Sequence, residues 1–256
     1  MSVLRLLAMI AASMIAVTAH AQTGVVLLHG KWGTPEGPTR PLEVALRGAG
    51  FRVIARDMPW SDTRAYDKDL DGAMAEIDAQ MAELRAAGVM HLVVAGQSLG
   101  ANMALAYAAR HPELDGVVAI SPGHAPERMR RNSEIAEDLQ RARAMLSSGR
   151  GGSYLNFEDI NQGRTRQVSA KPAVFISYFD PDGGAVMPRN AARLSPHTAL
   201  LWVVGRHDRM SDAGPGYAFD RAPKNPLSAY RVVEADHFSA PMVSRQVVVD
   251  WLKELR

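Results

Sequence analysis

The segment that most constrains the fold is residues 92–109, LVVAGQSLGANMALAYAA. It begins with a short apolar run that favours a β-strand, and it ends with an Ala-rich run that favours a helix. Between them lies GQSLG at residues 96–100, a G-x-S-x-G pattern. In such a turn the glycines allow a strand to pass sharply into a helix, and the serine stands at the tip. The segment therefore predicts a strand, a tight turn and a helix, with Ser98 as a candidate nucleophile.

An ordinary glycine-rich strand-to-helix turn is the alternative to this interpretation, since short motifs also occur by chance. The expected strand before the motif and the expected helix after it favour the nucleophile. A helix starting at Leu99 would direct its first N–H groups and its partial positive charge toward an oxyanion formed beside Ser98. The backbone N–H of Leu99 is therefore one expected oxyanion donor.

Apolar, β-prone runs alternate with helical patterns along most of the chain. Runs that are apolar throughout are typical of parallel strands buried on both faces. This pattern predicts one α/β domain over residues 22–256, with a mostly parallel central sheet and helices on both faces. The strands are expected at residues 24–28, 51–55, 92–95, 116–120, 173–178, 198–204 and 230–233. The helices are expected near residues 42–48, 70–87, 126–146 and 187–194, from the GQSLG turn to residue 109, and from 241 onward.

The alternation breaks after the strand at residues 116–120. Residues at about 124–170 hold a polar helical segment, a Gly-rich stretch at 149–152 and a run without clear periodicity. An insertion at this place would lie above the catalytic edge of the sheet, so we expect a small helical lid. Its arginines could attract an anionic substrate, but acidic residues are interspersed, which favours a solvated helix face with internal ion pairs.

The first 21 residues differ from the rest of the chain. Arg5 precedes an apolar run at residues 6–17, and Ala19-His20-Ala21 has the small residues of a cleavage site. This pattern predicts a signal peptide at residues 1–21 and a mature protein exported to the periplasm or secreted. An uncleaved anchor is the alternative, although the run is short for a membrane span, and no stable span is expected after cleavage.

Composition excludes several classes of function. The chain has 29 Lys and Arg against 27 Asp and Glu, with no block of like charges, so we expect no nucleic-acid partner. It has no cysteine, which excludes disulfides, thiolate metal sites and a cysteine nucleophile. The eight histidines are scattered, and no H-x-x-x-H pair occurs. We therefore expect neither a metal nor an organic cofactor.

Polar and aromatic residues follow the first two expected strands. The loop HGKWG at residues 29–33 could supply a second oxyanion donor, for which the backbone N–H of Lys31 is the candidate. Trp32 and Trp60 lie on loops at the edge where open α/β sheets bind ligands. With His124, at the mouth of the insertion, they are candidates for the substrate pocket. A tryptophan packed beneath a loop is an equally good interpretation.

Two further polar residues each follow an expected strand, as Ser98 does. Asp208 follows the strand at 198–204, and His237 follows the strand at 230–233. The chain order of nucleophile, acid and base, together with the early HG loop, resembles the α/β-hydrolase family over residues 24–256. The resemblance implies that His237 is the general base and that Asp208 orients it.

More than one acidic residue could be the acid of this set. Asp180 also follows an expected strand, but Asp208 is closer to His237 in sequence and ends a G-x-x-D pattern that matches the family. Asp212 and Asp236 are more remote candidates for the acid. His124 and His207 are rival candidates for the base, but neither follows the last strand.

The resemblance implies a serine hydrolase acting on a small-molecule acyl substrate. We expect it to cleave a carboxylic ester with a small or medium acyl group, lipids included, through an acyl-serine intermediate. A peptidase, an amidase or a thioesterase would use the same triad. A non-catalytic binding module on a hydrolase fold is the alternative from another class. The intact set of Ser98, Asp208 and His237 is an argument against that alternative.

Overall fold

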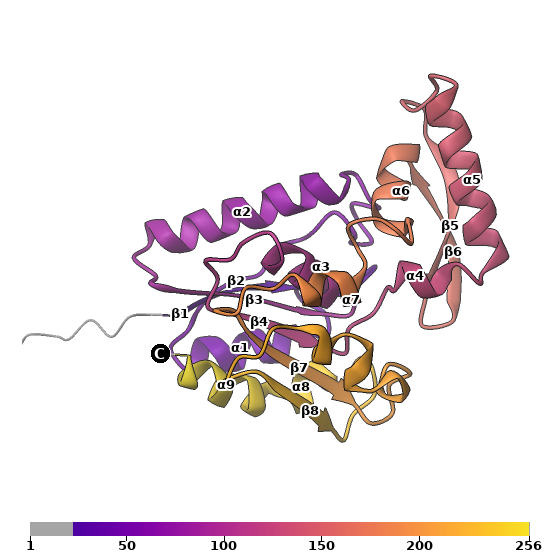
Figure 1. The fold of residues 1–256 in the computed structure, drawn as a ribbon. Coiled ribbons are helices and arrows are strands. Elements are labelled where there is room, and N and C mark those ends of the chain that lie inside the picture. The colour runs from indigo at the N-terminus through magenta and orange to yellow at the C-terminus, as the bar shows by residue number, and fades with distance from the viewer. Residues whose placement is uncertain (1–22, 256) are drawn as a thin grey trace, which may run out of the picture.

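The computed structural model describes residues 23–255 and contains a six-stranded central sheet, shown in Figure 1. The strand order is β2-β1-β3-β4-β7-β8, and every neighbouring pair is parallel. The prediction of a mostly parallel central sheet is therefore confirmed. The strands are β1 (Thr23–Leu28), β2 (Arg52–Ile54), β3 (His91–Gln97), β4 (Gly116–Ile120), β7 (Ala199–Gly205) and β8 (Ala229–Val233).

Helices cover both faces of the sheet (Figure 1). On one face lie α1 (Arg40–Gly48), α8 (Ala240–Val243) and α9 (Arg245–Glu254). On the other lie α2 (Leu70–Ala86), α3 (Leu99–Ala108) and α7 (Met187–Ala192). Successive residues of a strand point to opposite faces, so Val25 packs into the first layer and Val26 into the second. This explains why the central strands are apolar at nearly every position.

The chain between β4 and β7 leaves the sheet and forms a separate layer at one end of it (Figure 1). The expected polar helical segment is two helices, and the stretch to residue 170, expected to be irregular, forms an antiparallel hairpin. The hairpin pairs Leu155 with Ala170 and Asn161 with Arg164. The elements of the insertion are α4 (Pro126–Met129), α5 (Ser133–Ser147), β5 (Leu155–Asn161), β6 (Arg164–Ala170) and α6 (Pro172–Phe179).

The prediction of a strand at residues 173–178 is wrong, because these residues form α6. A short apolar run of this length does not distinguish a buried strand from a buried helix. The distinguishing signal is Pro172, which occupies the first helical turn, where its missing N–H costs nothing. One consequence is that Asp180 follows a helix rather than a strand of the sheet.

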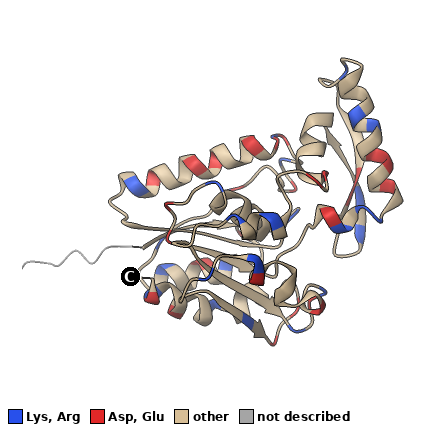
Figure 2. Ribbon diagram, viewed as in Figure 1, with Lys and Arg blue, Asp and Glu red and all other residues tan. Residues whose placement is uncertain are grey.

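Charges of both signs are distributed over the surface of the described residues (Figure 2). Within the insertion, Arg141 pairs with Asp138 at 2.8 Å, and Arg143 pairs with Asp180 at 3.1 Å. These arginines therefore have acidic partners, as the interspersed charges predicted. Three short 3-10 helices lie between β7 and β8, at Ser211–Ala213, Pro215–Tyr217 and Phe219–Arg221.

No helix between residues 23 and 255 is both long enough and apolar enough to cross a membrane. The predicted signal peptide at residues 1–21 lies outside the described residues.

Candidate active site

Ser98 lies at the turn between β3 and α3, with a backbone φ of 57° and ψ of −120°. This is a strained conformation for a residue with a side chain, and surrounding contacts must hold it. A Cβ on Gly96 would lie 2.3 Å from the carbonyl of Gly100, and a Cβ on Gly100 would lie 2.5 Å from the carbonyl oxygens of Leu28 and His29. Both glycines are therefore required by the close approach of strand and helix at the turn.

Three side chains form a continuous hydrogen-bonded chain at the carboxyl edge of the sheet. Nε2 of His237 lies 2.9 Å from Oγ of Ser98, and Nδ1 of His237 lies 2.7 Å from Oδ2 of Asp208. Each of the three residues is only 5% exposed. They come from the ends of β3, β7 and β8, which run parallel and so finish at the same edge. In this arrangement Nδ1–H donates to the carboxylate and Nε2 accepts the serine O–H.

The environment of Asp208 favours its ionised form. Burial, the largest single effect, would raise the pKa of this carboxyl, but the hydrogen bond and charge of His237, together with further hydrogen bonds, hold the pKa below its usual value. The backbone N–H of Met210 adds a hydrogen bond of 2.9 Å to Oδ1. An ionised Asp208 can hold the imidazole in one tautomer and stabilise an imidazolium.

The other candidate acids are bonded elsewhere. Asp180 pairs with Arg143 at the end of α6. Asp236 accepts hydrogen bonds from Phe238 and Ser239 within its own turn. Asp212 lies in the first 3-10 helix after β7. The structure therefore brings Asp208, and none of these three, to His237.

The rival bases are hydrogen-bonded to groups other than Ser98. His207 is exposed, and its Nε2 contacts Glu234 at 2.6 Å. His124 is buried, with its Nε2 2.8 Å from the carbonyl oxygen of Tyr178. Burial, with a smaller effect from the charge of Lys31, lowers the pKa of His124 to about 3, so its ring stays neutral.

The loop after β1, residues 29–33, contains the predicted second oxyanion donor. The Gly30 carbonyl accepts a hydrogen bond from the Gly33 N–H at 3.1 Å, and the Trp32 N–H donates to the Trp60 carbonyl at 3.0 Å. Among the described residues, no acceptor takes the N–H of Lys31. A Cβ on Gly30 would lie 3.1 Å from the Cβ of Ser98, so the loop lies directly against the nucleophile.

The N–H of Leu99 complements that of Lys31. Leu99 is the first residue of α3, where a helix has no acceptor of its own for the N–H. Leu99 adjoins Ser98 in the chain, and the loop that contains Lys31 packs against Ser98. A tetrahedral acyl-transfer intermediate requires two backbone donors, for which these two N–H groups remain the candidates.

A cavity of about 370 Å³ opens between this loop and the turn of the β5–β6 hairpin. Its lining includes Trp32, Gln97 next to the nucleophile, and Phe238 next to the base. Trp32, one of the candidates for the substrate pocket, therefore borders this cavity. Trp60 and His124 are not in this lining. Trp60 is fully buried, and its indole N–H donates to the carbonyl of His29 at 2.8 Å, behind the loop.

The sequence analysis did not identify Asp159, a fully buried carboxylate on β5 that contacts the loop at residues 29–33. The one feature of the sequence that could have predicted its burial is its position two residues after Phe157. Residues two apart in a strand lie on the same face, and both are buried on β5. Among residues 23–255, no group of three or more His, Asp or Glu residues is arranged to hold a metal ion.

Comparisons with known proteins agree with this fold. A family model described as "alpha/beta hydrolase fold" matches residues 24–175, more than half of the chain. A search of curated protein sequences finds no significant match.

Several solved structures are similar over nearly their whole length. Est1E from Butyrivibrio proteoclasticus, with ferulic acid bound, is 16% identical, with 93% of this chain and 91% of that chain covered and a TM-score of 0.68. A monoacylglycerol lipase from Paleococcus ferrophilus is 22% identical, with coverage of 91% and 95% and a TM-score of 0.65. A metagenome-derived lipolytic enzyme is 16% identical, with coverage of 92% and 94% and a TM-score of 0.65. At these identities the likeness shows a shared fold.

Proposed function

The chain belongs to the α/β-hydrolase fold family, and from this premise we propose that it is a serine hydrolase that cleaves a carboxylic ester through an acyl-serine intermediate. The observation that carries the proposal is the unbroken hydrogen-bonded chain from Ser98 through His237 to Asp208. Similar structures that are esterases and lipases support ester hydrolysis in particular.

The proposed reaction follows from what each group can do. A serine hydroxyl is a weak nucleophile until a base takes its proton, so Nε2 of His237 accepts the proton as Ser98 Oγ attacks the ester carbonyl. The N–H groups of Leu99 and Lys31 stabilise the oxyanion, with about 3 kcal/mol per donor. The C–O bond to the alcohol then breaks, and His237 returns the proton to the departing alkoxide.

The second half of the reaction repeats these roles with water. His237 removes a proton from a water molecule, which attacks the acyl carbon, and the same two N–H groups hold the second oxyanion. The bond from the acyl carbon to Ser98 Oγ breaks, Ser98 regains its proton from His237, and a carboxylic acid leaves. Asp208 remains ionised throughout, as its lowered pKa favours.

The cavity supports a small or medium acyl group. Its volume of about 370 Å³ is at the low end of the range for small-molecule pockets. Trp32 and Phe238 give it aromatic walls, and Gln97 adds an amide close to the nucleophile. Asn161, Gln162 and Arg164 add further polar side chains at the hairpin side of the cavity. The aromatic walls fit an acyl chain or an aromatic ester, short lipid esters included, and the polar side fits the ester group or a polar alcohol.

A panel of nitrophenyl esters of increasing acyl length, run with the wild-type protein and Ser98→Ala, tests this function. We expect turnover to peak at short or medium chains and to fall by at least about 10⁴-fold in Ser98→Ala. Equal turnover by both proteins would remove the serine from the mechanism. Faster cleavage of aminoacyl anilides or acyl thioesters than of esters would assign an amidase or thioesterase instead. No turnover of any of these substrates would favour a binding module.

We also propose that the protein is exported, on the basis of the pattern at residues 1–21. Expression of the full chain in a Gram-negative host, followed by fractionation and N-terminal sequencing, tests this. The expected product begins at Gln22 in the periplasm or medium. An unprocessed chain in the cytoplasm would contradict the proposal.

A further inference from the structure

The insertion reaches the candidate oxyanion loop through one buried carboxylate. Asp159 on β5 is fully buried and accepts three hydrogen bonds, one on Oδ1 and two on Oδ2. Nζ of Lys31 donates at 2.5 Å, Nε1 of Trp32 at 2.7 Å and the hydroxyl of Tyr66 at 2.9 Å. Two of the three donors are adjacent residues of the loop at residues 29–33.

The next two residues of β5 hold the same loop. The carbonyl oxygen of Ile160 accepts a hydrogen bond from Nζ of Lys31 at 2.9 Å, and Nδ2 of Asn161 donates to the Lys31 carbonyl at 3.1 Å. On the other side, the Trp32 N–H is bonded to the carbonyl of Trp60. The peptide group between Lys31 and Trp32 is therefore fixed at both its oxygen and its N–H.

This peptide group follows the N–H that the reaction would use, and its geometry needs external support. Trp32 has a φ of 57°, a left-handed conformation that is uncommon for a bulky residue. A strained backbone persists only when its surroundings hold it. The Lys31 N–H belongs to the preceding peptide group, whose oxygen on Gly30 accepts the Gly33 N–H within the loop. Bonds from β5, about 130 residues further along the chain, hold the side chain and the carbonyl of the same residue.

Charge makes this contact sensitive to substitution. The side chain of Lys31 is 2% exposed and that of Asp159 is 0% exposed. Burial lowers the pKa of Lys31, and the adjacent Asp159 carboxylate opposes that effect. Removing the carboxylate charge would leave a buried ammonium group without its counter-ion, which is strongly unfavourable. Lys31 would then move toward water, and its backbone would move with it.

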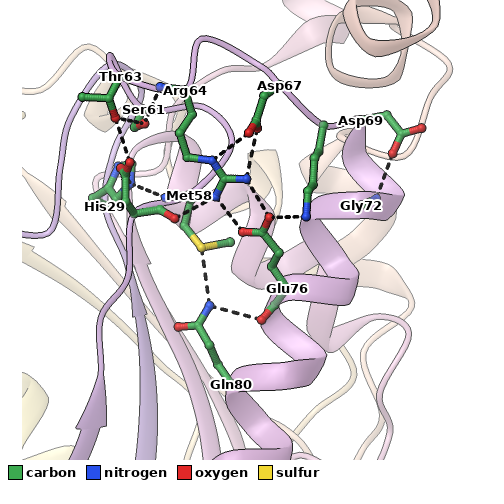
Figure 3. A network of polar contacts seen from close by, with 12 residues as sticks. His29, Met58, Ser61, Thr63, Arg64, Asp67, Asp69, Gly72, Glu76 and Gln80 are labelled. Carbon is green, nitrogen blue, oxygen red and sulfur yellow. Dashed lines mark hydrogen bonds and ion pairs between the residues drawn. The ribbon is translucent and has the colours of Figure 1, made fainter.

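The third donor comes from a loop with its own support. Tyr66 and the preceding Ala65 both have positive φ, at 61° and 46°. Figure 3 shows the network beside them, in which the guanidinium of Arg64 lies between Glu76 and Asp67. Arg64 donates to the two carboxylate oxygens of Glu76 at 2.7 and 2.6 Å. This network holds the loop in the conformation that presents the Tyr66 hydroxyl to Asp159.

We propose that Asp159 is a positioning residue for the oxyanion hole. The insertion holds the loop at residues 29–33 so that the Lys31 N–H points at the acyl oxygen. The inference rests on the proposed function and gives the insertion a part in stabilising the transition state, in addition to covering the site. Asp159 touches no reacting atom and acts through Lys31 and Trp32.

Asp159→Asn tests the proposal, with Asp138→Asn as a matched control. Asp138 belongs to the same insertion, but among the described residues its partners are the N–H of Glu158 on β5 and the side chain of Arg141, not the loop at residues 29–33. We expect Asp159→Asn to lower kcat by about 10- to 100-fold with KM within about 3-fold of wild type. Affinity for a boronic acid that forms a tetrahedral adduct on Ser98 should fall by the same factor as kcat. Asp138→Asn should change each value by less than about 2-fold.

Tyr66→Phe keeps the test valid if Asp159→Asn does not fold, which thermal melting would show. It removes one of the three donors to Asp159 while keeping the ring, and we expect a loss of about 3- to 10-fold in kcat with KM unchanged. An unchanged kcat in the folded variants, a change in KM alone, or an equal loss in Asp138→Asn would overturn the proposal.

Hydrogen exchange of the peptide covering residues 29–33 separates this inference from the proposed function. If the wild-type protein hydrolyses no ester, the proposed function fails, while exchange still reports on the loop. Faster exchange at these residues in Asp159→Asn, with wild-type rates in Asp138→Asn, supports the positioning role. Equal exchange in all three proteins contradicts it.

Discussion

The two halves of the site are built in different ways. The proton-transfer half consists of Ser98, Asp208 and His237, and each follows a strand of one parallel sheet by a few residues. The proposed oxyanion half uses Leu99, the first residue of α3, and Lys31, whose side chain and carbonyl are held by hydrogen bonds from β5 in the insertion. The sheet therefore sets the nucleophile and base, whereas contacts from outside the sheet set one of the two oxyanion donors.

This difference predicts different responses to substitution. Changes in the proton-transfer half should abolish turnover while the fold persists. Changes in the contacts around the oxyanion loop should lower the rate by smaller factors, and changes in the outer network should affect stability more than rate.

The largest expected effect comes from Asp208→Asn. The Met210 N–H would retain the amide oxygen, so the amide nitrogen would face Nδ1 of His237 and favour the tautomer with its proton on Nε2. That tautomer cannot accept the proton of Ser98, so we expect kcat to fall by about 10⁴-fold in a folded protein. Asp180→Asn is the control and should retain wild-type kcat. The reverse result would make Asp180 the acid.

An intermediate effect is expected from Gly123→Ala. The added methyl group would lie 2.8 Å from Oγ of Ser98 and 3.5 Å from Cε1 of His237, so the hydroxyl must leave its position. We expect kcat to fall by about 100-fold with little change in melting temperature, because the methyl group meets a side chain that can rotate. In Gly96→Ala the clash is with backbone, so melting temperature should fall as well. Full activity of Gly123→Ala would contradict the described geometry.

The smallest expected effect on activity is that of Glu76→Gln, in the outer network of Figure 3. Hydrogen bonds from Arg64 hold the pKa of Glu76 below its ordinary value of 4.5. We expect the free energy of unfolding at pH 7 to fall by about 1–2 kcal/mol, with kcat within about 2-fold of wild type.

The pH dependence of this stability follows from the sign of the shift. A carboxyl whose pKa is lowered on folding stabilises the protein fully above its unfolded pKa, and the contribution is lost as pH falls through the folded value. Denaturant unfolding of both proteins should therefore show a difference that is full at neutral pH and shrinks below pH 4.5. A difference that is constant over this range would contradict the assigned role of Arg64.

The sequence predicted the sheet and the proton-transfer half because their signals are local. Runs such as residues 24–28 and 116–120 have no polar side chain on either face, as is typical of strands buried on both sides. The G-x-S-x-G turn shows in five consecutive residues, and Asp208 and His237 follow strands directly. The positions of these side chains could be inferred without knowing any long-range contact.

The place of the insertion could be predicted, but its internal structure could not. The β5–β6 hairpin buries few side chains, among them Phe157 and Val168, so its period of two is masked by polar residues. Asp159 is an acid in a polar stretch, where sequence alone indicates a surface residue. Its burial depends on Lys31, Trp32 and Tyr66, which lie more than ninety positions away in the chain.

The most direct test of the central claim is the site of covalent attachment of a fluorophosphonate, found by mass spectrometry of the labelled protein. The account predicts one adduct per chain, on Ser98, with loss of ester hydrolysis in proportion to labelling. It also predicts no adduct on Ser98→Ala. Full hydrolysis by completely labelled protein, or an inactivating adduct on another residue, would contradict the account.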